Sequence, residues 1–532
     1  MPRYVCLLIC LSLAVSAAPA QARNAYRAGD TAAAARAYDA AVRGGPLTLY
    51  AFLVRFPKGA DLHIHISGAV YAETLIRDGG EDGLCVNTVA LSFSRPPCTG
   101  DLVPAAELSG NLTAAEQALY DRLIDSFSMR DFVPRAGWSG HDQFFATFAR
   151  FGGLKSSHLG EWVDEIARRA AWQNEQYLEL MDTPPFAHAT EIAGQIGWSK
   201  AMNRGDAADF ARLRKELLAH GLSEEVNADR EEVRRAEAER ERMERCGTPR
   251  AEAACKVEIR YLYQILRGYP PQQVFAQALL GFETVAADIK ANHGGFVGIN
   301  LVMPEDGYIA MRDYTLQMKM LDYLHSVYPQ VHITLHAGEL APGMVPPSGL
   351  RFHIRQAVEL GHAERIGHGV DIMYEDHPWQ LLREMAARHV MVEINLTSNA
   401  VILGIKGDEH PFPIYRAAHV PVALSTDDEG VSRIDLTHEY VMAAREYHLS
   451  YADMKELART SLEHAFLPGA SLWARPDNFS LPVAACQGQA LGGSWPTAAC
   501  KAFLAGSQKA AEQWELEKRF RAFEARFGPK NR

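Results

Sequence analysis

Histidines and acids stand at the ends of several strand-like segments of this chain, and together they could hold a divalent metal ion. His63 and His65 alternate along a short apolar segment, so both imidazoles should face the same side of a strand. Further segments end in His336, His368, Asp427 and Asp428. Neutral imidazole and carboxylate suit zinc, and a catalytic zinc keeps one position for water. The alternative for the pair His63 and His65 is one surface histidine and one buried structural histidine.

A carboxylic acid accompanies these histidines. Glu339 follows His336 by three residues, and Gly338 between them lets the chain turn and lets a ligand approach the backbone. A metal ion lowers the pKa of a bound water toward about 7, and Glu339 and His368 would then remain as proton carriers. These residues predict metal-assisted hydrolysis, although Glu339 could instead cap the next helix.

Eight strand-like segments would have to position these side chains. They comprise residues 59–68, 177–181, 257–266, 296–302, 331–339, 365–369, 390–395 and 420–428. Helical patterns separate most of them. A strand–helix alternation repeated eight times predicts an α/β fold, the (β/α)8 or TIM barrel, in which functional groups gather at the carboxyl ends of the strands.

The other segments are expected around a barrel that spans residues 51–475. A signal peptide is expected at 1–22, an N-terminal helical arm at 23–50, insertions at about 79–111 and 203–256, and a C-terminal disulfide-bearing and helical extension at 476–532. The second insertion is rich in Glu, Arg and Ala and is expected to be a solvated helical excursion. Aromatic residues at helical spacing within 141–148 are expected in the core rather than in a ligand-binding wall.

Composition restricts the partners and the compartment. The 532-residue chain has a net charge of −11 and no basic run with interleaved aromatics, which argues against nucleic acid. No segment after the signal is long enough to span a membrane. Cys6 and Cys10 leave with the signal. The favoured pairing of the other six cysteines is Cys85 with Cys98, Cys246 with Cys255 and Cys486 with Cys500, against other pairings or free thiols. We therefore expect a secreted or periplasmic protein.

Four motifs resemble the signatures of the adenosine deaminase family, in the family's order. They are PKGADLHIH at 57–65, HAGE at 336–339, RIGHG at 365–369 and STDD at 425–428, and SLEHAFL at 461–467 resembles the family's closing helix. The export signal, the arm and the cysteine-bearing excursions resemble its secreted, growth-factor-type branch. The resemblance implies hydrolytic deamination of a 6-aminopurine nucleoside, such as adenosine or deoxyadenosine, with one Zn²⁺ per chain.

The resemblance also implies roles for individual residues. The expected zinc ligands are His63, His65, His336 and Asp427. His368 would orient the water and help to take its proton, Glu339 would protonate purine N1, and Asp428 would hydrogen-bond N7. The expected substrate contacts also include Ser67, Gly68 and Met303. Ser67 stands where the family commonly has an acid that touches the ribose, and Met303 where it has a glycine.

Three alternatives remain open. The substrate could be another aminopurine, such as adenine or methylthioadenosine. The barrel could belong to an amide or ester hydrolase of the wider amidohydrolase superfamily, but its fourth strand lacks the lysine that two-metal members need. It could also be a secreted barrel that binds or signals without catalysis. A purine nucleoside is the expected partner, and a homodimer is left open.

Overall fold

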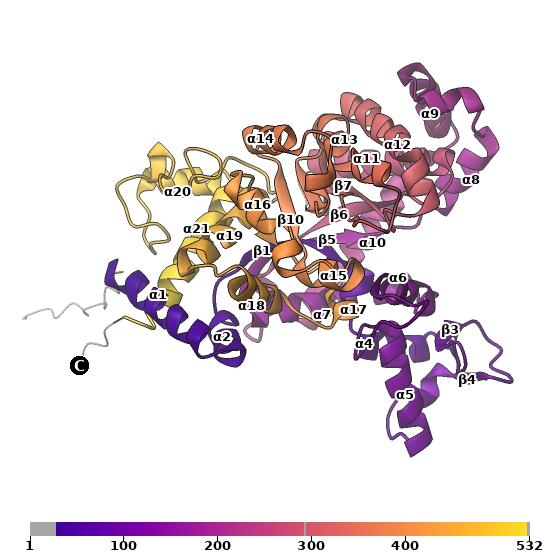
Figure 1. Cartoon of the computed structure of the whole chain (residues 1–532), viewed down its shortest axis with the longest axis horizontal. Coiled ribbons are helices and arrows are strands. Elements are labelled where there is room, and N and C mark those ends of the chain that lie inside the picture. The colour runs from indigo at the N-terminus through magenta and orange to yellow at the C-terminus, as the bar shows by residue number, and fades with distance from the viewer. Residues whose placement is uncertain (1–27, 292–293, 529–532) are drawn as a thin grey trace, which may run out of the picture.

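A parallel eight-stranded sheet forms the centre of the computed structural model, which describes residues 28–291 and 294–528 (Figure 1). In sheet order the strands are β1 (Gly59–His65), β5 (Glu175–Asp182), β6 (Glu258–Leu266), β7 (Phe296–Val302), β8 (His332–Ala337), β9 (Arg365–His368), β10 (Met391–Ile394) and β11 (Val422–Leu424). A parallel bridge between Ile64 and Asp427 joins the two edge strands. The predicted α/β barrel is confirmed, and each expected segment contains one strand.

Helices cover the outside of this barrel. They include α4 (Ala72–Glu81), α7 (Leu159–Trp172), α11 (Pro271–Ala291), α12 (Tyr308–Val327), α13 (His353–Glu359), α14 (Pro378–Arg388), α15 (Leu396–Ile402), α16 (Phe412–Ala417), α18 (Leu436–Glu446) and α19 (Tyr451–Glu463). Strands β7 and β9 are buried along their whole length, as expected for strands with side chains packed on both faces. Polar residues in such strands must therefore find partners inside the protein.

The first insertion forms a small lobe that projects from the barrel (Figure 1). The expected segment 79–111 contains the antiparallel strands β2 (Cys85–Asn87), β3 (Ser92–Ser94) and β4 (Leu102–Pro104). The lobe continues beyond this segment with α5 (Ala114–Phe127) and α6 (Gly140–Arg150). Phe93, Phe127 and Phe144 are buried in its core. A capping box of Ser139 and Asp142 begins α6 and satisfies backbone N–H groups at the start of this helix.

The second insertion is helical, as its composition predicts. The expected segment 203–256 holds α9 (Ala207–Ala219) and α10 (Leu222–Met243), and α8 (Ala187–Ile196) precedes it. The buried residues of α10 include Val226, Asp229, Glu232, Val233 and Ala236, at the spacing of one helix face, and this helix packs against α7 and α11. The expectation of a solvated helix therefore holds for the outward face only.

The N-terminal arm and the C-terminal extension pack together against the barrel. The arm consists of α1 (Ala28–Arg43) and α2 (Pro46–Leu53), and the extension includes α20 (Ala498–Ala505) and α21 (Gln508–Glu524). Phe52 contacts Phe523 edge to face, with ring centroids 5.2 Å apart, and Phe56 packs on Phe520. The two ends of the chain thus share one aromatic cluster.

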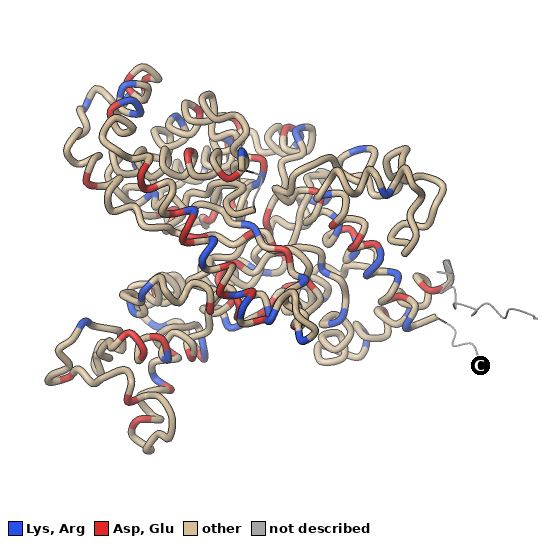
Figure 2. The backbone as a smooth tube through the Cα atoms, turned by 180° about the vertical axis from the view of Figure 1, so that it is seen from behind, with Lys and Arg blue, Asp and Glu red and all other residues tan. Residues whose placement is uncertain are grey.

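The three expected disulfides are present. They join Cys85 to Cys98, Cys246 to Cys255 and Cys486 to Cys500. Acidic and basic residues are interspersed along the described chain (Figure 2). Of the helices in the described ranges, none has both the length and the apolar character needed to cross a bilayer. The signal peptide expected at residues 1–22 lies outside the described residues.

Candidate active site

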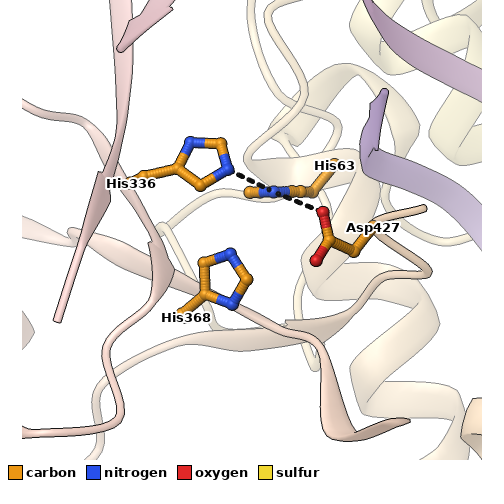
Figure 3. Close-up of side chains that lie close together, drawn as sticks. All are labelled: His63, His336, His368 and Asp427. Atoms are coloured by element: carbon orange, nitrogen blue, oxygen red, sulfur yellow. Dashed lines mark hydrogen bonds and ion pairs between the residues drawn. The ribbon is translucent and has the colours of Figure 1, made fainter. Parts of the chain in front are cut away.

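The four residues predicted as metal ligands meet at the carboxyl ends of β1, β8 and β11, and three of them appear in Figure 3. The Nε2 atoms of His63 and His65 lie 3.1 and 3.2 Å from Nε2 of His336. Oδ1 of Asp427 lies 3.5 and 3.2 Å from the same atoms of His63 and His65. Tetrahedral zinc with bonds of about 2.0–2.1 Å places its ligands roughly 3.3–3.4 Å apart. The donor set therefore fits a zinc-type ion.

A hydrogen bond at the other ring nitrogen fixes each of these imidazoles. The pairs are His63 Nδ1 with Glu393 Oε2 at 2.6 Å, His65 Nδ1 with Gln264 Oε1 at 3.1 Å and His336 Nδ1 with Asn300 Oδ1 at 2.9 Å. Because all three partners are acceptor oxygens, each Nδ1 carries the proton and each Nε2 is a bare lone pair. Lone pairs this close repel one another unless a cation lies between them. The geometry of the imidazoles thus favours a metal site.

The partner of His63 belongs to a buried ion network. Glu393 Oε1 accepts from Arg365 Nε at 2.6 Å, and Arg365 Nη2 also donates to Glu179 Oε2 at 2.6 Å. Burial opposes ionisation of Glu393, but the charge of Arg365 and the His63 hydrogen bond hold its pKa at about 2. Glu393 is therefore ionised and keeps the Nδ1 proton on His63.

Asp427 is fixed through both its backbone and its side chain. Its N–H donates to the carbonyl of His63 at 2.9 Å, and its own carbonyl accepts from the N–H of His65 at 3.2 Å. Ser398 Oγ donates to Asp427 Oδ2 at 2.6 Å, which leaves Oδ1 directed at the histidines. The residue has a φ of 61°, a left-handed conformation that is uncommon outside glycine and is often found at functional sites.

A cavity of about 460 Å³ opens beside this cluster. Its lining includes eight of the ten predicted site residues, namely His65, Ser67, Met303, His336, Glu339, His368, Asp427 and Asp428. His63 and Gly68 lie behind this lining. Phe145 and Phe148 of α6 form an apolar wall, while Phe144 also belongs to the lobe core. The expectation that the α6 aromatics are core residues is therefore incomplete, because they line the cavity as well.

Glu339 presents a carboxyl group that favours its protonated form. Burial raises its pKa well above the usual range, and the neighbouring carboxylates of Asp427 and Glu305 add to the shift. The oxygens of Glu305 accept from the backbone N–H groups of Gly338, at 3.0 Å, and Glu339, at 2.8 Å. The carboxylate of Glu305 therefore positions Glu339, which can hold a proton and donate it.

Asp428 is a second buried acid in the same cavity. Burial raises its pKa well above the usual range, and the neighbouring carboxylate of Asp427 adds to the shift. Its Oδ1 is buried and has no hydrogen-bond partner among the described residues. A side chain on Gly68 would place a Cβ atom 1.6 Å from that oxygen. Gly68 thus contributes the space that Asp428 occupies.

A chain of hydrogen bonds fixes the ring of His368. The backbone N–H of Phe412 donates to Nδ1 of His410 at 3.1 Å, so the other nitrogen of His410 carries the proton. That Nε2 lies 3.0 Å from Asn399 Oδ1, and Asn399 Nδ2 lies 2.9 Å from Nδ1 of His368. His368 therefore accepts at Nδ1 and carries its proton on Nε2.

The other ring nitrogen of His368 faces the metal cluster. Nε2 is buried and has no hydrogen-bond partner among the described residues, and Figure 3 shows one ring nitrogen directed towards the other three side chains. Burial lowers the pKa of His368 to about 3, so the ring is neutral near pH 7. A neutral imidazole with its proton on Nε2 donates a hydrogen bond into the cavity.

Met303 occupies a backbone conformation that favours glycine. Its φ is 90°, and its side chain is 40% exposed at the edge of the cavity. The positive φ agrees with the expectation that this position is a glycine in related sequences. Here the thioether adds apolar surface to the cavity instead.

The polar residues that hold the site in place were not predicted from the sequence. They are Gln264, Asn300, Glu305, Glu393, Ser398, Asn399 and His410. One signal was available, because Glu393 is a charged residue inside the apolar segment 390–395 and is followed closely by the polar run 397–399. A buried acid in a strand requires a partner.

Comparison with known proteins agrees with this geometry. Residues 239–472 match the family model described as adenosine deaminase. The matched region is therefore similar to the adenosine deaminase family. It contains β6 to β11 and the residues His336, Glu339, His368, Asp427 and Asp428.

Individual relatives match more restricted regions or share only the fold. An adenosine deaminase of Clostridium perfringens (strain ATCC 13124) is 34% identical over 135 residues, which is 25% of this chain and 37% of the relative. The match thus spans little more than a third of the relative's length. The apo structure of the N6-methyl-AMP deaminase from Arabidopsis thaliana has a TM-score of 0.50 and 22% identity, covering 79% of this chain and 94% of that chain. That likeness concerns the fold.

Proposed function

We propose that this protein is a zinc-dependent hydrolase that deaminates a 6-aminopurine nucleoside, with adenosine or deoxyadenosine giving inosine or deoxyinosine and ammonia. One observation carries the proposal. Two buried carboxyl groups with raised pKa values, a neutral histidine and three of the four expected metal ligands border one cavity of about 460 Å³, and the fourth ligand, His63, adjoins them. An acid and a metal set around an apolar cavity suit addition of water to a flat, nitrogen-rich ring.

The side chains have complementary roles in this scheme. Zn²⁺ would be held by His63, His65, His336 and Asp427 and would lower the pKa of water. Glu339 donates its proton to purine N1, which makes C6 electrophilic. Water then adds to C6 and gives up both of its protons: one restores the carboxyl group of Glu339, and the other leaves with the 6-amino group as ammonia, so that C6 keeps the oxygen. Asp428 donates to N7 from its protonated carboxyl group.

The role of His368 is narrower than the resemblance implies. Because its proton lies on Nε2, the ring can donate to the oxygen of the attacking water and so orient it. Removal of the proton from that water then requires a different acceptor, and the carboxylate of Glu339, after it has given its proton to N1, is the available one. We propose that His368 orients the water and that Glu339 carries the proton.

Turnover of a matched set of purines tests the proposal. Adenosine, deoxyadenosine, adenine and methylthioadenosine should be monitored by ultraviolet absorbance together with released ammonia. We expect the two nucleosides to be deaminated with the highest kcat/KM. Preference for adenine or methylthioadenosine would support another aminopurine deaminase, and no ammonia from any of them would favour a barrel that binds without catalysis.

Metal analysis of the purified protein provides an independent test. We expect about one zinc per chain, because the imidazole and carboxylate atoms surround a single point. Chelation should abolish turnover, and added Zn²⁺ should restore it. A stoichiometry of two, or none, would contradict the ligand assignment.

We further propose that the protein is secreted or periplasmic and of the growth-factor-type branch of the family. The charged and apolar start of the sequence and the three disulfides support this, since disulfides persist in oxidising compartments. Fractionation of cells that express the full chain, followed by sequencing of the mature N-terminus, tests it. Cleavage after Ala22 is the expected result, and an uncleaved intracellular chain would contradict it.

A further inference from the structure

A second cavity, of about 290 Å³, adjoins the candidate active site, and we call it the side pocket. Ser67, Thr183 and Gln264 line both spaces, so the two cavities share one border. Apolar residues such as Trp162 and Phe186 form much of its wall. The side pocket also contains the carboxyl groups of two residues that the catalytic scheme does not use.

These two acids are Asp182, at the carboxyl end of β5, and Glu232, on the inward face of α10. Glu232 is only 9% exposed, and its carboxylate has no hydrogen bond or ion pair with another described residue. Oδ2 of Asp182 is buried and also lacks a hydrogen-bond partner in the described ranges. Burying a carboxyl group without a partner is costly, so a ligand that donates hydrogen bonds would stabilise both.

The charges around this pocket are of one sign. Burial raises the pKa of Asp182 to about 7, and the carboxylate of Glu232 adds to the shift. Behind them, burial raises the pKa of Asp229 to about 8, and the other charges that act on it are also carboxylates. Among the described residues that line either cavity, none is Lys or Arg. A phosphate group would therefore meet negative charge without a cation to pair with it.

The direction of a bound purine connects the two cavities. If C6 faces the metal ligands and Glu339, N9 lies at the opposite side of the ring system and its substituent points away from them. Ser67 directly follows the β1 histidines and borders the side pocket, so a substituent of moderate size can pass from the catalytic cavity across Ser67.

We propose that the side pocket binds the sugar of the substrate, whose hydroxyls donate to Asp182 and Glu232, and that it rejects nucleosides bearing a phosphate. This inference rests on the proposed function and gives a role to the charged insertion, because α10 supplies Glu232. The substrate class is then a phosphate-free purine nucleoside rather than a free base or a nucleotide.

Equilibrium binding of the reaction products tests this independently of turnover. Hypoxanthine, inosine and inosine 5′-monophosphate form a series of base, base with sugar, and base with sugar and phosphate. Titration calorimetry should use the full-length zinc-loaded protein. We expect inosine to bind about tenfold or more tightly than hypoxanthine, because hydrogen bonds to buried carboxylates are strong. The monophosphate should bind about tenfold or more weakly than inosine.

Two isosteric substitutions then test whether the carboxyl groups of Asp182 and Glu232 cause these differences in affinity. In the double variant Asp182→Asn with Glu232→Gln, we expect the Kd of inosine to rise about tenfold while the Kd of hypoxanthine stays the same. The ratio between the Kd values of inosine 5′-monophosphate and inosine should become smaller. Glu231→Gln on α10 is the matched control, because Glu231 is exposed and pairs with Arg234. It should leave all three Kd values unchanged.

The outcomes separate this inference from the proposed function. An unchanged Kd of inosine in the double variant, tighter binding of the monophosphate to the wild type, or no binding of inosine would overturn the side-pocket proposal. If the expected binding pattern is found but adenosine is not deaminated, only the proposed function fails. If adenine or a nucleotide is the better substrate, deamination stands and the side-pocket proposal falls.

Discussion

At the scale of single residues, the candidate site depends on which buried groups carry protons. Burial raises the pKa of Glu339 and Asp428 but lowers that of His368 to about 3. Burial thus favours the protonated form of the two acids and the neutral form of the imidazole. Groups whose pKa values are driven apart in this way can be assigned separate roles as proton donor and orienting group.

Glu339→Gln should separate metal binding from catalysis. The amide keeps the shape of the side chain but cannot transfer a proton to N1, so kcat should fall by about 10² to 10⁴-fold while zinc content is unchanged. Ammonia release and metal analysis on the same sample measure both. Glu359→Gln, on an exposed residue paired with Arg355, is the matched control and should retain full activity. Full turnover by the Glu339→Gln variant would mean that another group supplies the proton.

Asn399→Ala should disturb the tautomer of His368. The variant removes the shorter of two amide contacts at Nδ1, at 2.9 Å, and leaves only Asn395 Nδ2 at 3.4 Å. The ring can then carry its proton on either nitrogen more readily, so kcat should fall by roughly tenfold or more while KM changes little. ¹⁵N chemical shifts of the histidine rings report the tautomer directly. His410→Gln keeps a side-chain donor to Asn399 and should retain more activity than His410→Ala. Unaltered ¹⁵N shifts in Asn399→Ala would contradict the chain of hydrogen bonds.

At the scale of elements, buried polar residues on different strands of the sheet hydrogen-bond to each other inside the barrel. Arg365 on β9 lies between Glu179 on β5 and Glu393 on β10, and its guanidinium stacks 3.8 Å from the centroid of the Phe466 ring. The network reaches the metal site through His63. The same hydrogen-bond network therefore joins strands inside the barrel and orients a proposed metal ligand.

Arg365→Met should destabilise the fold by about 3–5 kcal/mol, because it leaves two buried carboxylates without their cation. Urea denaturation followed by circular dichroism measures the loss. Arg388→Met removes an exposed pair with Glu384 and should cost less than about 1 kcal/mol. Equal stabilities of the two variants would show that the buried network contributes little.

The sequence predicts the barrel and the convergence of the polar residues at the ends of its strands. It does not predict the residues that hold those polar residues in place. Period-two apolar segments with His63, His65 and Asp427 at their ends are local signals. The Asn399–His410 and Arg365–Glu393 contacts join separate segments, so no local pattern indicates which polar groups will pair. The inward face of α10 was missed for a related reason, since a helix rich in Glu and Arg has the composition of a solvated one.

At the scale of the whole molecule, three disulfides cross-link residues that are close in sequence, one each in the lobe, the charged insertion and the C-terminal extension. All three close loops local in sequence, so each stabilises its own segment. The barrel itself has no disulfide among its described strands. Disulfide formation under oxidising conditions should therefore stabilise the peripheral segments more than the strands that carry the proposed metal ligands.

Peptide mapping without reductant should recover the pairs Cys85–Cys98, Cys246–Cys255 and Cys486–Cys500. A peptide that joins cysteines of different pairs would contradict the structure. Replacing both Cys486 and Cys500 by serine opens a loop with a sequence separation of 14, which should cost about 3 kcal/mol in the chain-entropy description. Thermal unfolding of the double variant beside the wild type measures this.

The seam where the cylinder closes has a consequence for the unloaded protein. The first and last strands meet through the backbone of Asp427, and the side chain of the same residue would bind the ion. Chelation would expose the mutual repulsion of the imidazole lone pairs at that seam. Hydrogen–deuterium exchange should then accelerate at the amides of His65 and Asp427 more than in the middle of β6. Such a result would mean that a bound ion stabilises the closure of the barrel in addition to its proposed part in catalysis.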